Sequence, residues 1–210
     1  MNFRRLLASE IDVRVATVKE GKGMSLLLYK DARVDQNILD ETVGGTNWQR
    51  KHELIGNNLY CTVSIWDEHK QMWVSKQDVG TESKTEAEKG QASDSFKRAC
   101  FNWGIGRELY TAPFIWVNMA NGIDKYTKFV VKEIGYDADG NINKLIILTK
   151  DGQPVYRYEN ITRADMMAVI DKKYPEGSKN LTALLDSFGV KTLEDATDAQ
   201  LYAVYNKVHK

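Results

Sequence analysis

Apolar and polar residues alternate along several short runs in the first part of the chain, and a period of two is typical of β-strands. Ile11, Val13 and Val15 form the apolar side of one such run, after a short helix that we expect at 3–10. A second strand is expected at 25–30, and a Gly-Lys-Gly sequence supplies the turn between the two strands. The pattern therefore predicts a β-hairpin in this part of the chain.

A helix is expected next. Asp31 is a residue type that caps helices, and Val34 and Ile38 follow it at helical spacing. The helix should extend to about Val43, because Gly44-Gly45 follows directly.

Three strand-like runs then lie at 47–55, 58–66 and 70–79, with polar turn sequences between them. The middle run alternates strictly, and its apolar side consists of Leu59, Cys61, Val63 and Ile65. Because short turns join antiparallel neighbours, these runs predict an antiparallel meander with one strongly apolar face.

The clearest helical pattern in the chain lies at 84–103. Ser83 and Glu86 match a capping box at its start, and Gly104 stands where a glycine cap often ends a helix. The apolar positions of this segment recur at helical spacing: Ala92, Phe96, Ala99, Cys100 and Trp103. We therefore expect a long helix that packs on the meander.

The segments after this helix divide into strands and then short helices. The strands are expected at 114–117, 126–136, 143–150 and 154–158, the middle two as a hairpin and the last as an edge strand. The helices are expected at 162–174, 180–188 and 197–208, with Thr197 and Gln200 as a second capping box.

These elements define an α+β fold, in which an antiparallel β-meander packs on a long helix to form a β-β-β-α core. The composition changes after about Glu159. We therefore expect one domain at 1–158 and a small helical module or tail at 159–210.

Composition and charge limit the kind of binding site. The chain has 210 residues with 42% apolar residues, enough for a packed core. Lysines and arginines number 29, as do aspartates and glutamates, so the whole chain has no field that would attract nucleic acid. Any nucleic-acid site must be a local basic patch or groove.

The residues give little support for catalysis. The two cysteines are far apart inside apolar runs, and the three histidines are scattered, so we expect buried reduced thiols in a cytoplasmic protein and no metal site. No phosphate-binding GxxxxGK[ST] loop, GxSxG elbow or carboxylate-lysine cluster is present, and no run approaches the ~20 apolar residues of a membrane span. We expect a protein that is not an enzyme and needs no cofactor.

The segment 89–110 contains the most informative charges. On a helical wheel, Lys97 and Arg98 lie on the two shoulders opposite the apolar stripe, and Lys89 lies nearer its edge. From this pattern alone, an ordinary solvated face is favoured over a binding site.

A resemblance to a known family reverses that preference. Residues 94–99 read DSFKRA and are followed by Trp103-Gly104, which resembles the core motif of the Rad-fifty-two single-strand annealing family. Residues 104–110, GIGRELY, resemble the form in phage and bacterial members, and 44–48, GGTNW, resemble the family's glycine-then-tryptophan segment. Asp78-Val79-Gly80, Glu88-Lys89 and Asp94 fall at the family's spacing. The resemblance covers about 29–110, roughly two-fifths of the chain.

The resemblance implies roles for individual residues. Lys97 and Arg98 match the basic pair of the family's inner DNA groove, and Arg33 matches a further groove arginine, with one extra residue before Trp48. Lys89 matches a basic helix position.

The sequence departs from the family at one groove position. Phe101 stands where eukaryotic members have another groove arginine. The groove is then less charged, or Arg107 or a base-stacking aromatic residue compensates.

The tryptophans require separate treatment. For Trp103, which lies on the apolar stripe, core packing is favoured over base stacking; for Trp48, at the start of a strand, both remain open. The candidate DNA-binding residues are Lys97, Arg98, Arg33, Lys89, Arg107 and Trp48.

The resemblance implies binding of single-stranded DNA and annealing of complementary strands without ATP, by a homo-oligomeric ring acting in recombination and repair. A host single-strand-binding protein or recombinase is a candidate partner for the tail. Three alternatives remain: an RNA-binding or strand-protecting protein without annealing activity, a metal-dependent nuclease, and a purely structural oligomer.

Overall fold

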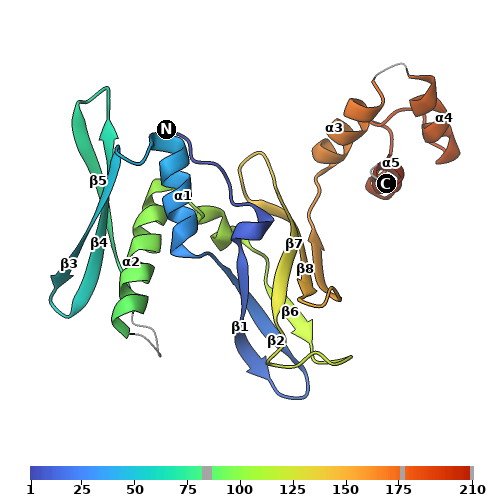
Figure 1. The fold of residues 1–210 in the computed structure, drawn as a ribbon. Helices are drawn as coiled ribbons and strands as arrows, with labels where there is room; N and C mark the ends of the chain where they lie inside the picture. The colour runs from blue at the N-terminus through green and yellow to red at the C-terminus, as the bar shows by residue number, and fades with distance from the viewer. Residues whose placement is uncertain (82–86, 176–177, 209–210) are drawn as a thin grey trace. The chain divides into compact units, whose positions relative to one another are not determined.

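The computed structural model describes residues 1–81, 87–175 and 178–208, and confirms an α+β fold (Figure 1). The chain divides into two compact units, Met1–Tyr158 and Glu159–Lys210. Each unit has a separate cluster of buried apolar residues, so each is described by itself.

The first unit contains a six-stranded sheet in the order β6-β2-β1-β7-β8-β9. Its strands are β1 (Asp12–Lys19), β2 (Gly23–Tyr29), β6 (Ile115–Asn118), β7 (Phe129–Tyr136), β8 (Ile142–Thr149) and β9 (Pro154–Glu159). The predicted hairpins β1–β2 and β7–β8 are confirmed as antiparallel pairs, and β9 lies at an edge. Gly23 is required where β2 pairs with β6, because a side chain there would collide with the backbone of Val117.

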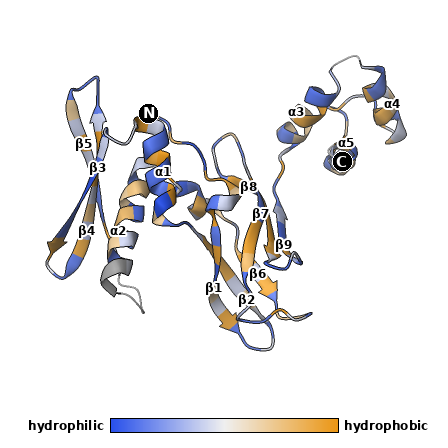
Figure 2. Cartoon of the chain, viewed as in Figure 1, coloured by the Kyte–Doolittle hydropathy of each residue, from blue (hydrophilic) through white to orange (hydrophobic). Residues whose placement is uncertain are grey.

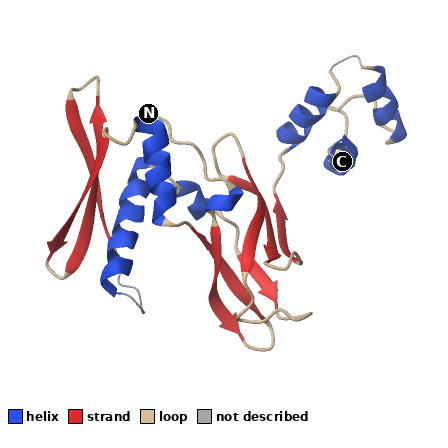
Figure 3. Cartoon of the chain, in the orientation of Figure 1, coloured by secondary structure: helices blue, strands red, loops and turns tan. Residues whose placement is uncertain are grey.

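The predicted meander forms a second, three-stranded sheet in the order β3-β4-β5. Its strands are β3 (Trp48–Ile55), β4 (Asn58–Asp67) and β5 (Met72–Val79), and both pairs are antiparallel. The helix α2 (Ala87–Trp103) lies against this sheet, and α1 (Ala32–Val43) lies beside α2 (Figure 3). The predicted capping box of Ser83 and Glu86 lies outside the described residues.

The apolar stripe of α2 faces the core, as its spacing predicts. Phe96, Ala99 and Cys100 are fully buried with Cys61 and Val63 of β4. Figure 2 shows apolar positions interrupted by polar ones along the strands and helices. This pattern arises because each element buries one side and leaves the other in water.

Local capping explains two of the boundaries. The Asp31 carboxylate accepts a hydrogen bond from the backbone N–H of Arg33, which confirms it as the N-cap of α1. At the C-terminal end of α2, Gly104 has a φ of 99°, and the N–H of Ile105 donates a hydrogen bond to the carbonyl of Cys100. Glycine adopts this left-handed conformation without a Cβ penalty, so the helix ends there.

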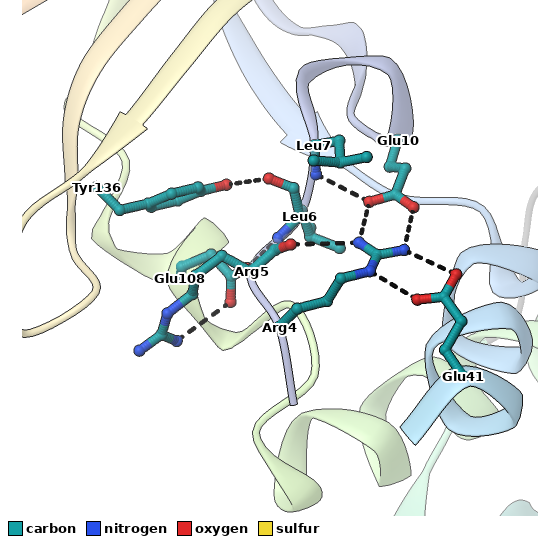
Figure 4. A network of polar contacts seen from close by, with 8 residues as sticks. All are labelled: Arg4, Arg5, Leu6, Leu7, Glu10, Glu41, Glu108 and Tyr136. Atoms are coloured by element: carbon teal, nitrogen blue, oxygen red, sulfur yellow. Dashed lines mark hydrogen bonds and ion pairs between the residues drawn. The ribbon is translucent and has the colours of Figure 1, made fainter. Parts of the chain in front are cut away.

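The prediction of a helix over residues 3 to 10 is wrong except at its end. There, Ala8–Glu10 form a single turn of 3-10 helix. Tertiary contacts hold the preceding segment extended (Figure 4). Arg4 donates hydrogen bonds to the carboxylates of both Glu10 and Glu41. The backbone of Leu6 donates to Glu108 and accepts from the hydroxyl of Tyr136. These partners satisfy backbone groups that a helix would otherwise pair.

The second unit contains α3 (Arg163–Lys173), α4 (Lys179–Ser187) and α5 (Asp198–Val208), close to the predicted helical segments. The capping box at α5 is confirmed, because Thr197 and Gln200 exchange hydrogen bonds between side chain and backbone. Arg163 donates to the carbonyls of Leu193, Glu194 and Ala196, which ties the start of α3 to the segment before α5. Within the described ranges, no helix has the length and apolar character needed to cross a membrane.

Candidate nucleic-acid interface

A pocket of about 450 Å³ lies beside Lys97, which is called the Lys97 pocket below. It lies between α2, the β1–β2 hairpin and the short 3-10 helix Arg107–Thr111. Its lining residues are Arg14, Leu27, Leu28, Tyr29, Lys30, Asp94, Lys97, Phe101, Leu109 and Tyr110. The register of the hairpin explains why both of its strands line the pocket, because Arg14 lies opposite Leu27 on their outward face.

Two cations of this pocket are suited to bind an anion. Arg14 is exposed and Lys97 is half-buried, and no ion pair with another described residue engages either of them. The acidic residue of the lining, Asp94, accepts hydrogen bonds from the backbone and hydroxyl of Thr81, at 3.0 and 3.1 Å. Because the lining contains Arg14, Lys30 and Lys97 against the single carboxylate of Asp94, its local charge is positive although the chain is neutral.

Arg33 pairs with Asp31, which directly follows the lining residue Lys30 in the chain. Its side chain is 83% exposed and forms an ion pair with Asp31 at 2.8 Å. The pKa of Asp31 is below its usual value, mainly because Arg33 donates hydrogen bonds to it, and the charge of Lys97 contributes. Neither Arg33 nor Asp31 lines the Lys97 pocket, and the ion pair with Asp31 already engages the charge of Arg33.

Lys30, a lining residue of the pocket, belongs to a buried ion pair. Lys30 and Asp35 are 1% and 0% exposed, and the Lys30 ammonium contacts the Asp35 carboxylate. Burial raises the pKa of Asp35 to about 6, against the opposing charge of Lys30. The Lys30 ammonium also lies 4.4 Å from the centre of the Phe101 ring. This contact holds the Phe101 ring at the wall of the pocket.

Arg98 lies on a different side of α2 from the Lys97 pocket. Its guanidinium forms an ion pair with Asp78 of β5 at 3.2 Å, and its side chain is 41% exposed. Asn102, one turn later, also donates to Asp78. Lys97 and Arg98 therefore contact different neighbours, and the charge of Arg98 is largely compensated.

The remaining predicted residues are more dispersed. Arg107 is exposed and donates to the carbonyls of Phe101 and Asn102 at the end of α2, which is a favourable position for a cation. Trp48 is half-buried, stacks on Phe96 with ring centres 6.1 Å apart, and donates to Asp40. Its ring is thus already used in packing. The side chain of Lys89 lies outside the described residues.

Trp103 packs in the protein, as its position on the apolar stripe predicts. It lies against the core cluster, and its indole donates to the carbonyl of Val63 at 3.1 Å. Lys76 lies over its ring at 4.6 Å.

The sequence analysis did not identify Arg14, Tyr29 or Tyr110 as candidates for the site. A signal for Tyr29 was available, because Leu27 and Tyr29 are apolar residues on the outward face of a hairpin. Their grouping with Lys97 depends on tertiary packing, which the local pattern does not specify. Across the described ranges, no cluster of three or more His, Cys, Asp or Glu side chains could hold a metal ion.

The fold and this pocket define a compact α+β unit with a local cationic and aromatic surface. The chain is similar to the single-stranded DNA-binding protein DdrA of Deinococcus radiodurans, with 34% identity over 95 residues. The matched region is 44% of this chain and 44% of that protein, so the chain covers less than half of its relative's length. No protein-family profile matches the chain. No solved structure matches it.

Proposed function

We propose that this protein binds single-stranded DNA and anneals complementary strands without ATP, as an oligomeric ring in recombination and repair. The observation that carries the proposal is the Lys97 pocket, where two cations without an ion-pair partner among the described residues adjoin exposed aromatic rings. Such combinations bind single strands with little sequence preference. The similarity to a single-stranded DNA-binding protein supports the same substrate class.

The proposed mechanism needs no catalytic group. Lysine and arginine side chains hold the phosphates without reading sequence, so that most bases remain available for pairing. Pairing itself supplies the free energy, about 1.4 kcal/mol for each base-pair step of DNA. The protein therefore acts as a binding scaffold and not as an enzyme.

Oligomerisation would join weak sites into one continuous groove. A single subunit with few phosphate contacts binds weakly, whereas several subunits on one strand act through effective concentration. The meander has two edge strands, β3 and β5, and the backbone groups along such edges are a template for pairing with another chain. We propose that these edges form the subunit joint.

The experiment is to measure the affinity of the oligomer for a fluorescent oligothymidylate over a range of salt concentrations. Lys97→Ala should weaken binding and reduce the slope of log affinity against log salt by about 0.7 for each lost phosphate contact. Arg98→Ala should have a smaller effect, because Asp78 already compensates its charge. Lys132→Ala, an exposed cation on β7, is the matched control and should change neither quantity.

Unchanged affinity in a folded, oligomeric Lys97→Ala variant would contradict the proposed site. Tight binding without faster strand pairing would instead favour a protein that only protects single strands. Strand cleavage that depends on a divalent metal would support the nuclease alternative.

A further inference from the structure

One wall of the Lys97 pocket is aromatic, which phosphate binding alone does not require. Tyr29, Phe101 and Tyr110 line it together with the two cations. Tyr110 is 70% exposed although it lies within a well-packed unit. Large aromatic side chains that gather on an exposed surface are characteristic of binding sites.

We propose that the pocket is a nucleobase subsite, in which one base of the bound strand stacks on Tyr110 while Lys97 and Arg14 contact the adjacent phosphates. This inference rests on the proposed function and adds a base-binding element to it. It also gives a role to Phe101, which stands where eukaryotic members of the family that this sequence resembles have a groove arginine.

The aromatic rings are fixed before a ligand arrives. Tyr110 contacts Phe101 edge to face, with ring centres 5.2 Å apart and planes at 78°. Phe101 is held in turn by Lys30, whose ammonium the buried Asp35 anchors. Gly106 allows this contact, since any side chain there would collide with Lys30. A prearranged surface of this kind loses little conformational entropy on binding.

The size and charge of the pocket fit a nucleotide better than a purely apolar ligand. Its volume of about 450 Å³ falls in the usual range for small-molecule sites, roughly 300–1,000 Å³. Asp35 is paired with Lys30, and Asp31 with Arg33. Asp94 keeps its negative charge although Thr81 donates hydrogen bonds to it, and Arg14 and Lys97 outnumber it in the lining. An anion next to Lys97 and Arg14 would therefore meet two cations, and the adjacent base would meet the rings.

The subsite would also distinguish single strands from duplexes. A base in a duplex is stacked and paired, and must be extracted before it can reach a protein ring. A base of a single strand is free to stack on Tyr110. The pocket would therefore hold the first strand and release it once pairing is complete.

The test compares the protein's affinity for a short fluorescent oligothymidylate with its affinity for an abasic oligonucleotide of the same length and backbone. Loss of one base–aromatic stack corresponds to about 5- to 150-fold in affinity for each site. Tyr110→Ala should lower the affinity for the oligothymidylate by a factor in this range and leave the affinity for the abasic oligomer unchanged. Tyr110→Phe should retain the wild-type preference, because it keeps the ring.

Tyr126→Ala is the matched control, since Tyr126 is 75% exposed and lies outside the Lys97 pocket. It should change neither affinity. As a second readout, an iodouracil-substituted oligonucleotide should photo-crosslink to the peptide that contains Tyr110 in the wild-type oligomer.

The outcomes separate this inference from the proposed function. Suppose that Lys97→Ala weakens binding of both oligonucleotides, whereas Tyr110→Ala changes neither affinity or lowers both equally. The base subsite is then wrong, and the proposal of DNA binding stands. The same result is expected if the pocket instead binds an apolar peptide or a segment of a second copy of this protein. If the wild-type protein binds neither oligonucleotide, the proposed function fails as well.

Discussion

Replacing Asp35 with alanine should destabilise the Met1–Tyr158 unit by about 3–5 kcal/mol, because it leaves the Lys30 ammonium buried without its partner. Both side chains are almost completely removed from water, at 1% and 0% exposed. Desolvation is therefore the dominant cost, and a surface ion pair would lose far less.

A double replacement separates the cost of an unpaired charge from the value of the pair. Lys30→Met with Asp35→Leu removes both charges and keeps apolar volume, so its stability should be close to that of the wild type. With the single variants Lys30→Met and Asp35→Leu measured as well, the coupling within the pair is the loss of the double variant minus the summed losses of these two single variants.

Urea unfolding followed by tryptophan fluorescence is a suitable assay. All five tryptophans, Trp48, Trp66, Trp73, Trp103 and Trp116, lie before residue 158, so the signal reports on the first unit alone. The single variant should also lower Tm by about 6–20 °C, as expected for a unit of this size. A loss below about 1 kcal/mol for Asp35→Ala, or an equally large loss for the double variant, would refute the reasoning.

The pH dependence of stability tests the same pair. Burial raises the pKa of Asp35 from 3.8 to about 6, so the folded state binds this proton more tightly than the unfolded state does. Unlike alanine, the protonated carboxyl keeps an oxygen that accepts a hydrogen bond from Lys30. Its contribution to the free energy of unfolding is therefore fully present below pH 3.8 and is lost as the pH rises through about 6. The stability of the wild type relative to Asp35→Asn should decline across this window. A relative stability that rises with pH would contradict the assigned direction.

Two further predictions concern groups near the site. Asp78→Asn removes the partner of Arg98 and should increase affinity for single-stranded DNA severalfold, which a fluorescence anisotropy titration would detect; unchanged affinity would mean that DNA does not reach Arg98. Burial raises the pKa of Cys61 to about 11 and also raises that of Cys100, so neither thiol should react with iodoacetamide near pH 8 until the protein is unfolded. Rapid labelling of the folded protein would contradict this, because it would show that the apolar core around Cys61 and Cys100 opens.

The sequence was most informative where one periodic pattern extended over many residues. The α2 stripe and the meander were predicted because a helix and a half-buried strand each repeat at their own period. The segment before Ala8 was mispredicted because its conformation depends on Glu41, Glu108 and Tyr136, which are distant in sequence. Local patterns also did not specify that β1 and β2 share a sheet with β6–β9.

The candidate site shows the same division. The helical wheel indicated that Lys97 and Arg98 point away from the core, but not that Asp78 would pair with Arg98. Arg14 and Tyr110 join Lys97 only after the hairpin, α2 and the 3-10 helix are packed together. A sequence pattern defines which side of an element is polar, whereas the partners on that side depend on tertiary structure.

The central claim is that this protein anneals single strands without ATP. The most direct measurement is the rate at which two complementary fluorescent oligonucleotides pair in the presence of the protein, with no nucleotide and no divalent metal, while its mass in solution is recorded. The account predicts pairing faster than the spontaneous rate, by an oligomer and not a monomer, and slower pairing with Lys97→Ala. Pairing at the spontaneous rate, despite tight binding of each strand, would contradict it.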